Sequence, residues 1–402
     1  MYINYNKLID LGICKSFFYK MKIKQNLAFI KKNKTKVLNR LANQTHYKVI
    51  FYVYDCAKWK CQSLYDLMGK SKDFTPLIVV TKNAANNIDN PSYQTQEEIL
   101  NTFEFFKSRG MNVEMGYNFT LEKHIPLKEF EPDIIIYQHP WYVETSQGPV
   151  VCSEFALTAY IPYDIATTNL PSDYNLRFHN YVENFFVFNN SFKEYYSQRM
   201  DNKGENIKVT GALALDYFTA HPPKNEKQYV IYAPHWTVKH EGTIAYSTFA
   251  ETGKFMLEYA KRNPQFNWLF KPHPMLKKAL IDNKIMTKQE VKEYYNSWSE
   301  ACFDGDYFKY FNDSQLMITD CSTFLLEYAV TQKPLIRLVS KNMPEFNTTT
   351  EEVVKTYYNA QDIQELEKYL DMILKEKNDP MKKHRKGFPT LNTAKQILSN
   401  LL

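Results

Sequence analysis

Three segments in the second half of the chain share one layout, in which a run of apolar, β-favouring residues stops at a polar loop. They are YVIYAPHW at 229–236, FNWLFKPHP at 266–274 and QLMITDCSTFLLEYAVTQKPLI at 315–336. Each loop carries a His, Ser, Thr or Asp side chain. Loops that follow the carboxyl ends of parallel strands gather at one edge of the sheet, so three such loops can build one ligand site. The pattern therefore predicts an enzyme with an α/β fold.

The first half of the chain also alternates between predicted strands and helices. Strands are predicted at KVIFYVYD (48–55), TPLIVVTK (75–82), PDIIIYQHP (132–140), FALTAYIPYD (155–164), NFFVFNN (184–190) and NIKVTGAL (206–213). Apolar residues at helical spacing lie between several of these strands, for example over 94–107. Strands separated by helices favour parallel pairing, with helices on both faces of the sheet.

Length and composition predict two domains. A chain of 402 residues with 44% hydrophobic content divides most naturally into domains of roughly 150–200 residues. We predict a basic helical arm over 1–47, a first Rossmann-like domain over 48–220, a second over 221–390 and a closing helix over 391–402. The second domain begins at HPPKNEK (221–227), a Pro- and charge-rich stretch that is typical of a linker.

The positive charge of the chain is concentrated at its start. Residues 1–48 contain eleven Lys and Arg side chains and one acidic residue, Asp10, which gives a net charge of +10. The whole chain carries +6, so the remainder is acidic. Apolar residues such as Leu8, Leu11 and Ile30 accompany the lysines, so the arm either lies on an anionic membrane surface or packs on its own domain. An acidic main body without a nucleic-acid motif argues against a nucleic-acid partner.

Several classes of protein are disfavoured by what the sequence lacks. The six cysteines form no CxxC pair and have no His partners at zinc spacing, which argues against a disulfide framework or a structural metal and favours a reducing cytoplasm. No apolar run is long enough to span a membrane, and no signal peptide is indicated. Asp304-Gly-Asp306 imitates a DxD metal motif, but it precedes a predicted strand and is therefore interpreted as a turn.

The motifs together resemble a known family. VTGALALD (209–216), YAPHW (232–236), KPHP (271–274) and ITDCST with its following EY and KP (318–334) look like the CDP-glycerol glycerophosphotransferase family, whose members build teichoic acids and related capsule polymers. The resemblance is firmest over about 205–340. It implies a GT-B fold, with two Rossmann-like domains facing a cleft and the nucleotide held mainly by the second. It also implies transfer of a polyol-phosphate from a CDP-activated donor to an acceptor hydroxyl, with release of CMP.

The donor diphosphate is expected in the second domain. Ser322 and Thr323 follow a predicted strand at the point where a helix should begin, and free N–H groups there can bind phosphate without a metal. His273 lies between two prolines on a stiff loop, from which it can stabilise charge on the phosphoryl group, and Lys271 adds a positive charge. As an alternative, Ser322 and Thr323 could only cap the helix, which is a common role of these residue types. His273 could instead bond to the backbone and shape its turn.

Further donor contacts are predicted for His235 and Glu327. His235 stands where the family commonly has Thr, and it could contact the donor phosphate or polyol. Glu327 is a candidate for a ribose hydroxyl, with a solvent-facing role as the alternative. Neither a cofactor nor an essential metal is predicted, because the donor is itself the substrate.

The general base is expected in the first domain. The family's Trp-His-Gly segment is absent, since the chain contains no His-Gly dipeptide. His139 ends a predicted strand and is the substitute candidate, because an imidazole with an ordinary pKa near 6.5 suits proton transfer at neutral pH. Tyr163 and Asp164 are the fallback, and packing between aromatic residues is the structural alternative.

The sequence thus predicts a GT-B transferase at the cytoplasmic face of the cell membrane. It would move glycerol-phosphate, or a related polyol-phosphate, onto a glycan or a lipid-linked acceptor, as in teichoic acid or capsule polysaccharide biosynthesis. A GT-B glycosyltransferase that uses a nucleotide sugar is one alternative. The other is a non-catalytic protein that docks on membranes through residues 1–48.

Overall fold

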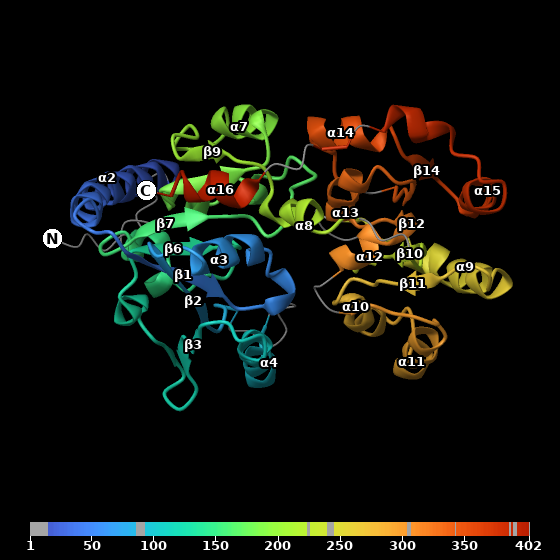
Figure 1. The fold of residues 1–402 in the computed structure, drawn as a ribbon, viewed down its shortest axis with the longest axis horizontal. Coiled ribbons are helices and arrows are strands. Elements are labelled where there is room, and N and C mark those ends of the chain that lie inside the picture. Colours follow the sequence, from blue (N-terminus) through green and yellow to red (C-terminus); the bar gives the residue numbers. More distant parts are fainter. Residues whose placement is uncertain are drawn as a thin grey trace. The chain divides into compact units, whose positions relative to one another are not determined.

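The chain forms two compact units in this computed structural model. Unit 1 consists of residues 1–163, 174–213 and 393–402, and unit 2 of residues 164–173 and 214–392. The structure describes residues 15–85, 93–222, 226–238, 245–303, 307–341, 343–385, 387–388 and 392–401. Each unit has its own parallel sheet (Figure 1). The division falls between 213 and 214, close to the predicted boundary at 220, and it assigns the C-terminal helix to unit 1.

Unit 1 contains a seven-stranded sheet in the order β3-β2-β1-β6-β7-β8-β9, with every neighbouring pair parallel. The strands are β1 (Tyr47–Val53), β2 (Phe74–Val80), β3 (Val113–Met115), β6 (Ile134–Tyr137), β7 (Leu157–Tyr160), β8 (Asn184–Val187) and β9 (Ile207–Val209). A small antiparallel hairpin, β4 (Tyr117–Asn118) with β5 (Lys123–His124), follows β3. All six strands predicted for the first half are confirmed. Strand β3 was not predicted, because its three residues, VEM, carry too little periodicity to read.

Helices cover both faces of this sheet. They are α2 (Lys15–Leu41), α3 (Gln62–Gly69), α4 (Gln96–Lys107), α5 (Pro149–Cys152), α6 (Arg177–Tyr181), α7 (Asn190–Ser197) and α16 (Thr393–Leu398). Helix α4 begins with a capping box, in which the Thr95 side chain accepts from the N–H of Glu98 and the Glu98 carboxylate accepts from the N–H of Thr95. The apolar side chains of β1 pack against Leu64 and Met68 of α3 in the main core.

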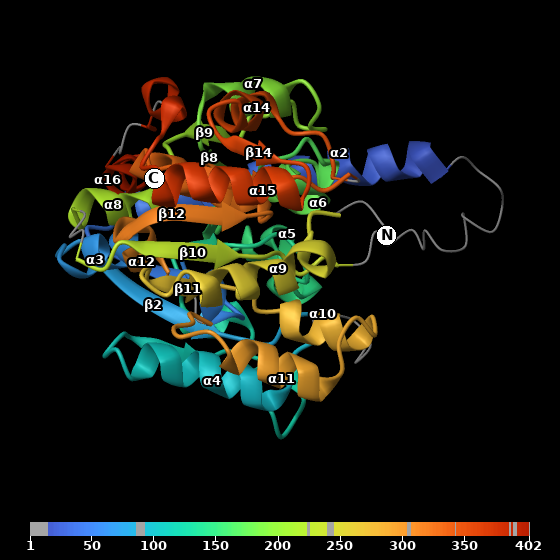
Figure 2. The same cartoon turned by 90° about the vertical axis from the view of Figure 1, so that its right-hand side faces the viewer.

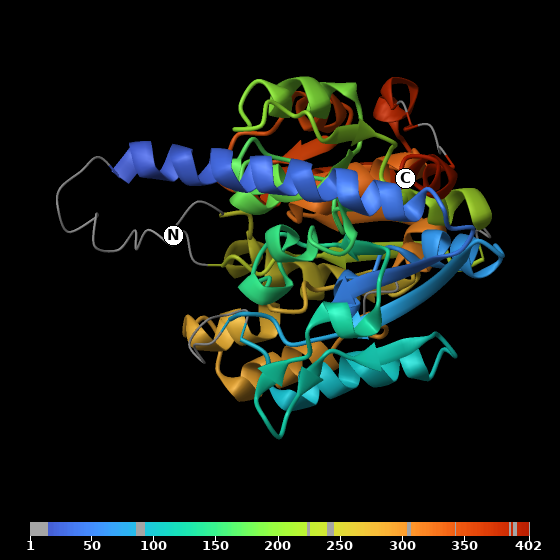
Figure 3. The same cartoon turned by 90° about the vertical axis from the view of Figure 1, so that its left-hand side faces the viewer.

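The basic helix α2 lies along unit 1 (Figure 3). Its apolar side chains make the contact. Ile23 and Ile30 are buried in a small cluster with Tyr181, and Val37 and Leu41 join the main core. Lysines 24, 31, 32 and 36 remain exposed. In the described part of the arm, the buried apolar residues therefore pack on unit 1, and the exposed surface of the helix is mainly cationic. Leu8 and Leu11 lie outside the described residues.

Unit 2 contains a five-stranded parallel sheet in the order β11-β10-β12-β13-β14. Its strands are β10 (Tyr229–Ala233), β11 (Trp268–Phe270), β12 (Ser314–Thr319), β13 (Leu335–Leu338) and β14 (Tyr358–Ala360). Its helices are α8 (Asp216–Ala220), α9 (Phe249–Arg262), α10 (Leu276–Asp282), α11 (Lys288–Asn296), α12 (Phe308–Asn312), α13 (Ser322–Glu327), α14 (Thr348–Val354) and α15 (Ile363–Leu370). Strands β10, β11 and β12 confirm the strands predicted in segments 229–236, 266–274 and 315–336.

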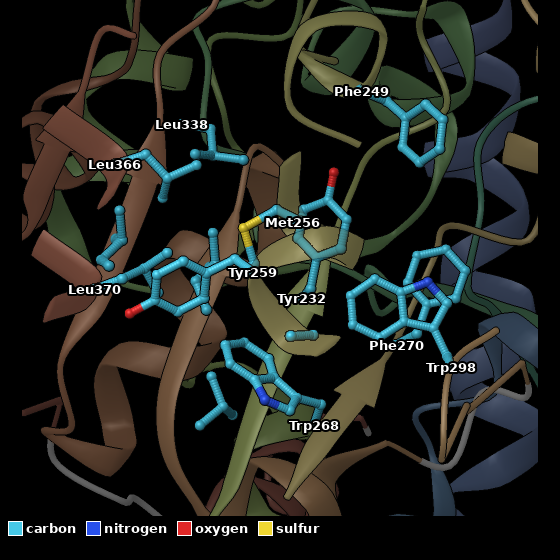
Figure 4. Packing of buried hydrophobic residues seen from close by; sticks show 14 of the residues in the cluster. Tyr232, Phe249, Met256, Tyr259, Trp268, Phe270, Trp298, Leu338, Leu366 and Leu370 are labelled. Atoms are coloured by element: carbon cyan, nitrogen blue, oxygen red, sulfur yellow. The ribbon is translucent and has the colours of Figure 1, made fainter. Parts of the chain in front are cut away.

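The strand period of two divides the core of unit 2 into two layers. Val230 and Tyr232 of β10 face a cluster that contains Met256 and Tyr259 of α9 and Leu366 of α15 (Figures 2 and 4). The intervening residues Tyr229, Ile231 and Ala233 belong to a second cluster with residues of α12 and α13. Helices thus cover both faces of the sheet, as in a doubly wound α/β fold.

Candidate functional site

The central strands of unit 2 end in three loops on one edge of the sheet. Strand β10 is paired with β11 on one side and β12 on the other, and all three run parallel. We name the loops after these strands: the β10 loop (234–238), the β11 loop (271–275) and the β12 loop (320–323). The chain leaves β10 toward β11 and returns on its other side as β12, so β10 and β12 flank a topological switch point. Ligands of open α/β sheets bind at such points.

His235 on the β10 loop is held in one tautomer. The backbone N–H of Thr237 donates to His235 Nδ1 at 3.3 Å, and the Thr237 hydroxyl lies 2.9 Å from the same nitrogen. Because Nδ1 accepts, the ring proton lies on Nε2. Burial lowers the pKa of His235 to about 3, so the ring is neutral at physiological pH.

His273 on the β11 loop lies beside it. The ring centroids of His273 and His235 are 5.1 Å apart, and Trp236 lies 6.0 Å from His273. The N–H of His273 donates to the carbonyl of Pro234 at 3.0 Å, which joins the two loops. The N–H of Met275 donates to His273 Nδ1 at 3.2 Å, so this ring also carries a proton on Nε2. Two neighbouring imidazoles therefore each offer an N–H donor, which suits an anionic ligand.

Lys271 and Glu327 belong to one buried polar group. Lys271 is 3% exposed, and its ammonium lies 5.3 Å from the centre of the Tyr307 ring. The Tyr307 hydroxyl donates to Glu327 Oε2 at 2.7 Å, and Glu327 is fully buried. The solvent-facing alternative for Glu327 is therefore wrong, whereas its contact with a ribose hydroxyl stays a prediction.

Helix α13 begins at Ser322, directly after the β12 loop turns away from strand β12, as the sequence indicated. The residue at its N-cap is Cys321, which makes no side-chain capping hydrogen bond. Ser322 and Thr323 occupy the first two helical positions, and both are partly exposed. The alternative in which these two residues only cap the helix is thus not what the structure shows.

Asp320 ties the β12 loop to the rest of the site. Its Oδ1 accepts the N–H of His235 at 2.6 Å, and its Oδ2 accepts the N–H and the hydroxyl of Thr248 at 2.6 and 2.9 Å. Burial raises the pKa of Asp320 to about 6, while these donors oppose the rise. The carboxylate therefore fixes the β10 loop and the start of α9 relative to the β12 loop.

Sequence reasoning missed Tyr246, Thr248 and Tyr307 as members of this site. The N–H of Tyr246 donates to Thr237 Oγ1 at 3.0 Å, and the Tyr246 ring packs edge-on to His235 at 5.2 Å. None of the three residues lies at a strand end, so motif order gave no signal for them. Lys239 and His240 of the predicted His235 loop lie outside the described residues, as do Asp304 and Asp306.

In unit 1, His139 also lies at a switch point, where β6 and β1 are neighbours. Its ring is fully buried, 3.8 Å from that of Tyr54 and 6.1 Å from that of Tyr163. Neither ring nitrogen has a hydrogen-bond partner within the described residues. Burial, with a smaller effect from the Lys58 charge, lowers the pKa of His139 well below its ordinary value. The ring is therefore a neutral imidazole, and the ordinary pKa near 6.5 that the sequence analysis expected for it is wrong.

Within the described ranges, no group of three or more His, Cys, Asp or Glu side chains is arranged to hold a metal ion. No helix in the described part of the chain is both long enough and apolar enough to cross a membrane.

Comparison with known proteins places these motifs in a family. Residues 218–380 match the family model described as CDP-Glycerol:Poly(glycerophosphate) glycerophosphotransferase. This range contains the β10, β11 and β12 loops. The resemblance that the sequence predicted is confirmed over this range.

One curated protein similar to this chain is a teichoic acid poly(ribitol-phosphate) polymerase of Bacillus spizizenii. It is 24% identical over 251 residues, which cover 57% of this chain and 37% of the relative. The matched part of the chain thus spans well under half of that relative's length.

Solved structures show the same fold. A variant of the wall teichoic acid polymerase TagF has a TM-score of 0.55 at 13% identity, over 96% of this chain and 98% of that one. A UDP-GlcNAc 2-epimerase from Neisseria meningitidis, bound to UDP-GlcNAc, has a TM-score of 0.53 at 15% identity, over 88% and 99%. The GT-B-type α/β fold predicted from the sequence is confirmed by these likenesses.

Proposed function

We propose that this chain transfers glycerol-phosphate, or a related polyol-phosphate, from a CDP-activated donor to a hydroxyl of a glycan or lipid-linked acceptor. The observation that carries the proposal is the pair of neutral imidazoles, His235 and His273, whose rings lie 5.1 Å apart at the strand ends of the family domain. Each carries its proton on Nε2 and can donate it to a phosphate oxygen. The family match over 218–380 supports a CDP-polyol donor, and the similarity to a poly(ribitol-phosphate) polymerase supports transfer of a polyol-phosphate.

The donor diphosphate binds across the β11 and β12 loops. His273 donates to a phosphate oxygen, and Ser322 and Thr323 supply hydroxyl and backbone donors from the start of α13. His235 contributes a second imidazole. Lys271, whose ammonium lies over the Tyr307 ring, provides positive charge. Oriented donors in a site with little water stabilise the charge that develops on the departing phosphate.

The reaction is an in-line displacement at the β-phosphorus. An acceptor hydroxyl oxygen forms the new bond to that phosphorus, and the bond from the phosphorus to the bridging oxygen breaks. CMP leaves with the electron pair of the broken bond. His139 is the proposed general base that takes the hydroxyl proton. Its place after β6, at the switch point of the unit 1 sheet, supports this role.

No essential metal or other cofactor is proposed, since His273, Lys271 and the start of α13 supply the donors and charge that a diphosphate needs. The proposed partners are the nucleotide donor and the acceptor. We also propose that the exposed lysines of α2 attract the chain to the anionic inner face of the cell membrane, where a lipid-linked acceptor would lie.

A donor screen tests the proposal. Purified chain is titrated with CDP-glycerol, CDP-ribitol, UDP-GlcNAc and GDP-mannose by calorimetry, and transfer is followed as release of CMP. Binding of a CDP-polyol with CMP release on addition of acceptor supports the proposal. Tight binding of a UDP- or GDP-sugar with no response to CDP-polyols would favour a nucleotide-sugar glycosyltransferase instead.

A further inference from the structure

Residues 164–173, which we name the strap, belong to unit 2 although the chain on either side of them belongs to unit 1. The strap is fixed to the segment before α14. Thr168 forms an antiparallel bridge with Phe346, the N–H of Asn347 donates to the carbonyl of Thr167 at 2.9 Å, and the Asn347 side chain donates to the carbonyl of Ala166 at 2.8 Å. Asn347 is itself the N-cap of α14. The strap is therefore a built part of unit 2.

Tyr246 connects the strap with the β12 loop. The hydroxyls of Ser322, Thr168 and Thr167 all interact with its phenol, and they oppose the rise in pKa that burial causes. The backbone of Tyr246 is fixed by the 3.0 Å hydrogen bond to Thr237, and its ring by packing on His235. Hydroxyls of the strap and of the proposed phosphate site thus meet at one side chain.

Asp173 places a carboxylate next to this group. The hydroxyl of Thr168 donates to its Oδ2 at 3.2 Å, and that of Ser172 donates to its Oδ1 at 3.3 Å. A carboxylate oxygen can accept two hydrogen bonds, and each oxygen here accepts one from the described residues. Asp173 is partly exposed. Burial and the charge of Asp164 raise the pKa of Asp173 to about 7, while the hydroxyls of Thr168 and Ser172 oppose the rise. Above that pH its carboxylate can accept from ligand hydroxyls beside Tyr246.

We propose that Asp173 and Thr168 form a hydroxyl-binding subsite beside the β12 loop. This inference rests on the proposed function, because Ser322 is taken to hold the donor diphosphate. A CDP-polyol carries hydroxyls on both sides of that diphosphate, in its ribose and in its polyol. The subsite recognises hydroxyls on the part of the donor that lies on the Tyr246 side of the phosphates, and it thereby contributes to selection of the donor.

The test is calorimetric titration of the full-length chain with two probes, CDP and CDP-glycerol. Asp173→Asn is compared with wild type, and Thr168→Val is a second variant that keeps the side-chain shape and removes the hydroxyl. The matched control is Asp282→Asn, which changes an exposed Asp of α10. Loss of a hydrogen bond to a charged group predicts roughly 10- to 100-fold weaker binding for Asp173→Asn, and Asp282→Asn binds like wild type.

The two probes identify the source of the hydroxyls. Weaker binding of CDP-glycerol with unchanged binding of CDP assigns the subsite to the polyol, whereas an equal loss for both assigns it to the ribose. Binding of both probes at wild-type affinity by Asp173→Asn and Thr168→Val would overturn the subsite and leave the proposed function intact. A wild-type chain that binds neither probe would overturn the proposed function, and the subsite with it.

Discussion

The imidazole rings of His235 and His273 lie 5.1 Å apart, on loops that follow neighbouring parallel strands. A backbone hydrogen bond from His273 to Pro234 joins the loops, and each ring is held with its proton on Nε2. Neutral donors can bind phosphate without the cost of desolvating a second buried cation. We therefore expect these two histidines to be central to donor binding.

Replacing His273 should weaken both donor binding and transfer. His273→Ala removes the N–H donor that we propose for the phosphoryl group, and loss of one such donor typically lowers the rate by roughly 10²–10³-fold. CMP release from CDP-glycerol measures the effect. His384→Ala, which alters an exposed histidine of unit 2, is the control and should retain wild-type activity. Equal activity of both variants would remove His273 from the proposed mechanism.

Replacing Asp320 should loosen the loops. In Asp320→Asn an NH₂ group replaces one of the two oxygens that accept the N–H groups of His235 and Thr248, so one buried donor loses its acceptor. The expected cost is about 2–4 kcal/mol in the free energy of unfolding. Chemical denaturation measures this cost beside Asp282→Asn. An unchanged midpoint for Asp320→Asn would mean that the carboxylate does not hold the loops together.

His235 should make the chain sensitive to acid. Its pKa is about 3 in the folded chain and near 6.5 when unfolded, so the unfolded state binds more protons between these values. Stability from this group is therefore complete above about pH 6.5 and is lost as pH falls toward 3. The stability difference between wild type and His235→Gln should shrink by about 2–3 kcal/mol between pH 6.5 and 4.5. A stability difference that does not change with pH would contradict a buried neutral His235.

His139→Gln separates catalysis from packing. A general base typically contributes 10²–10⁴-fold, so transfer should fall by roughly 10²-fold or more while affinity for CDP-glycerol stays at the wild-type value. Calorimetry and CMP release measure the two quantities on one preparation. If transfer persists and only thermal stability falls, the ring merely packs against Tyr54.

Charge reversal on α2 tests the membrane proposal. Each exposed Lys near an anionic surface is worth about 1 kcal/mol, so the triple variant Lys24→Glu, Lys31→Glu and Lys32→Glu should bind phosphatidylserine vesicles at least roughly 10²-fold more weakly. The control reverses three exposed lysines of unit 2: Lys277, Lys288 and Lys292. Vesicle sedimentation at low and high salt measures binding. Equal losses for both triple variants would point to net charge rather than α2.

Local patterns predicted most of the fold because each strand is a short run of buried, β-branched or aromatic residues. Strand β10, YVIYA, is buried at every position and was therefore easy to find. Strand β14, YNA, has three residues with Asn at its centre and gave no such signal. Elements of this size exist because neighbouring strands complete their hydrogen bonds, which a local pattern cannot reveal.

Apart from Glu327 at the end of α13, the predicted site residues of unit 2 lie close after strand ends, and motif order was enough to name them. The residues that position them come from elsewhere in the chain. Tyr307 is far from a strand end and holds Glu327, while the strap carries Asp173 into unit 2 from a stretch that the sequence assigned to the first domain. Such contacts depend on how distant segments pack, so one sequence alone did not indicate them.

A structure of the chain with CDP-glycerol bound tests the central claim most directly. The account predicts that the diphosphate lies at the carboxyl edge of β10, β11 and β12, with phosphate oxygens within hydrogen-bonding distance of His273 Nε2 and of Ser322 or Thr323. Density for the diphosphate at another edge of the sheet, or in unit 1, would contradict it.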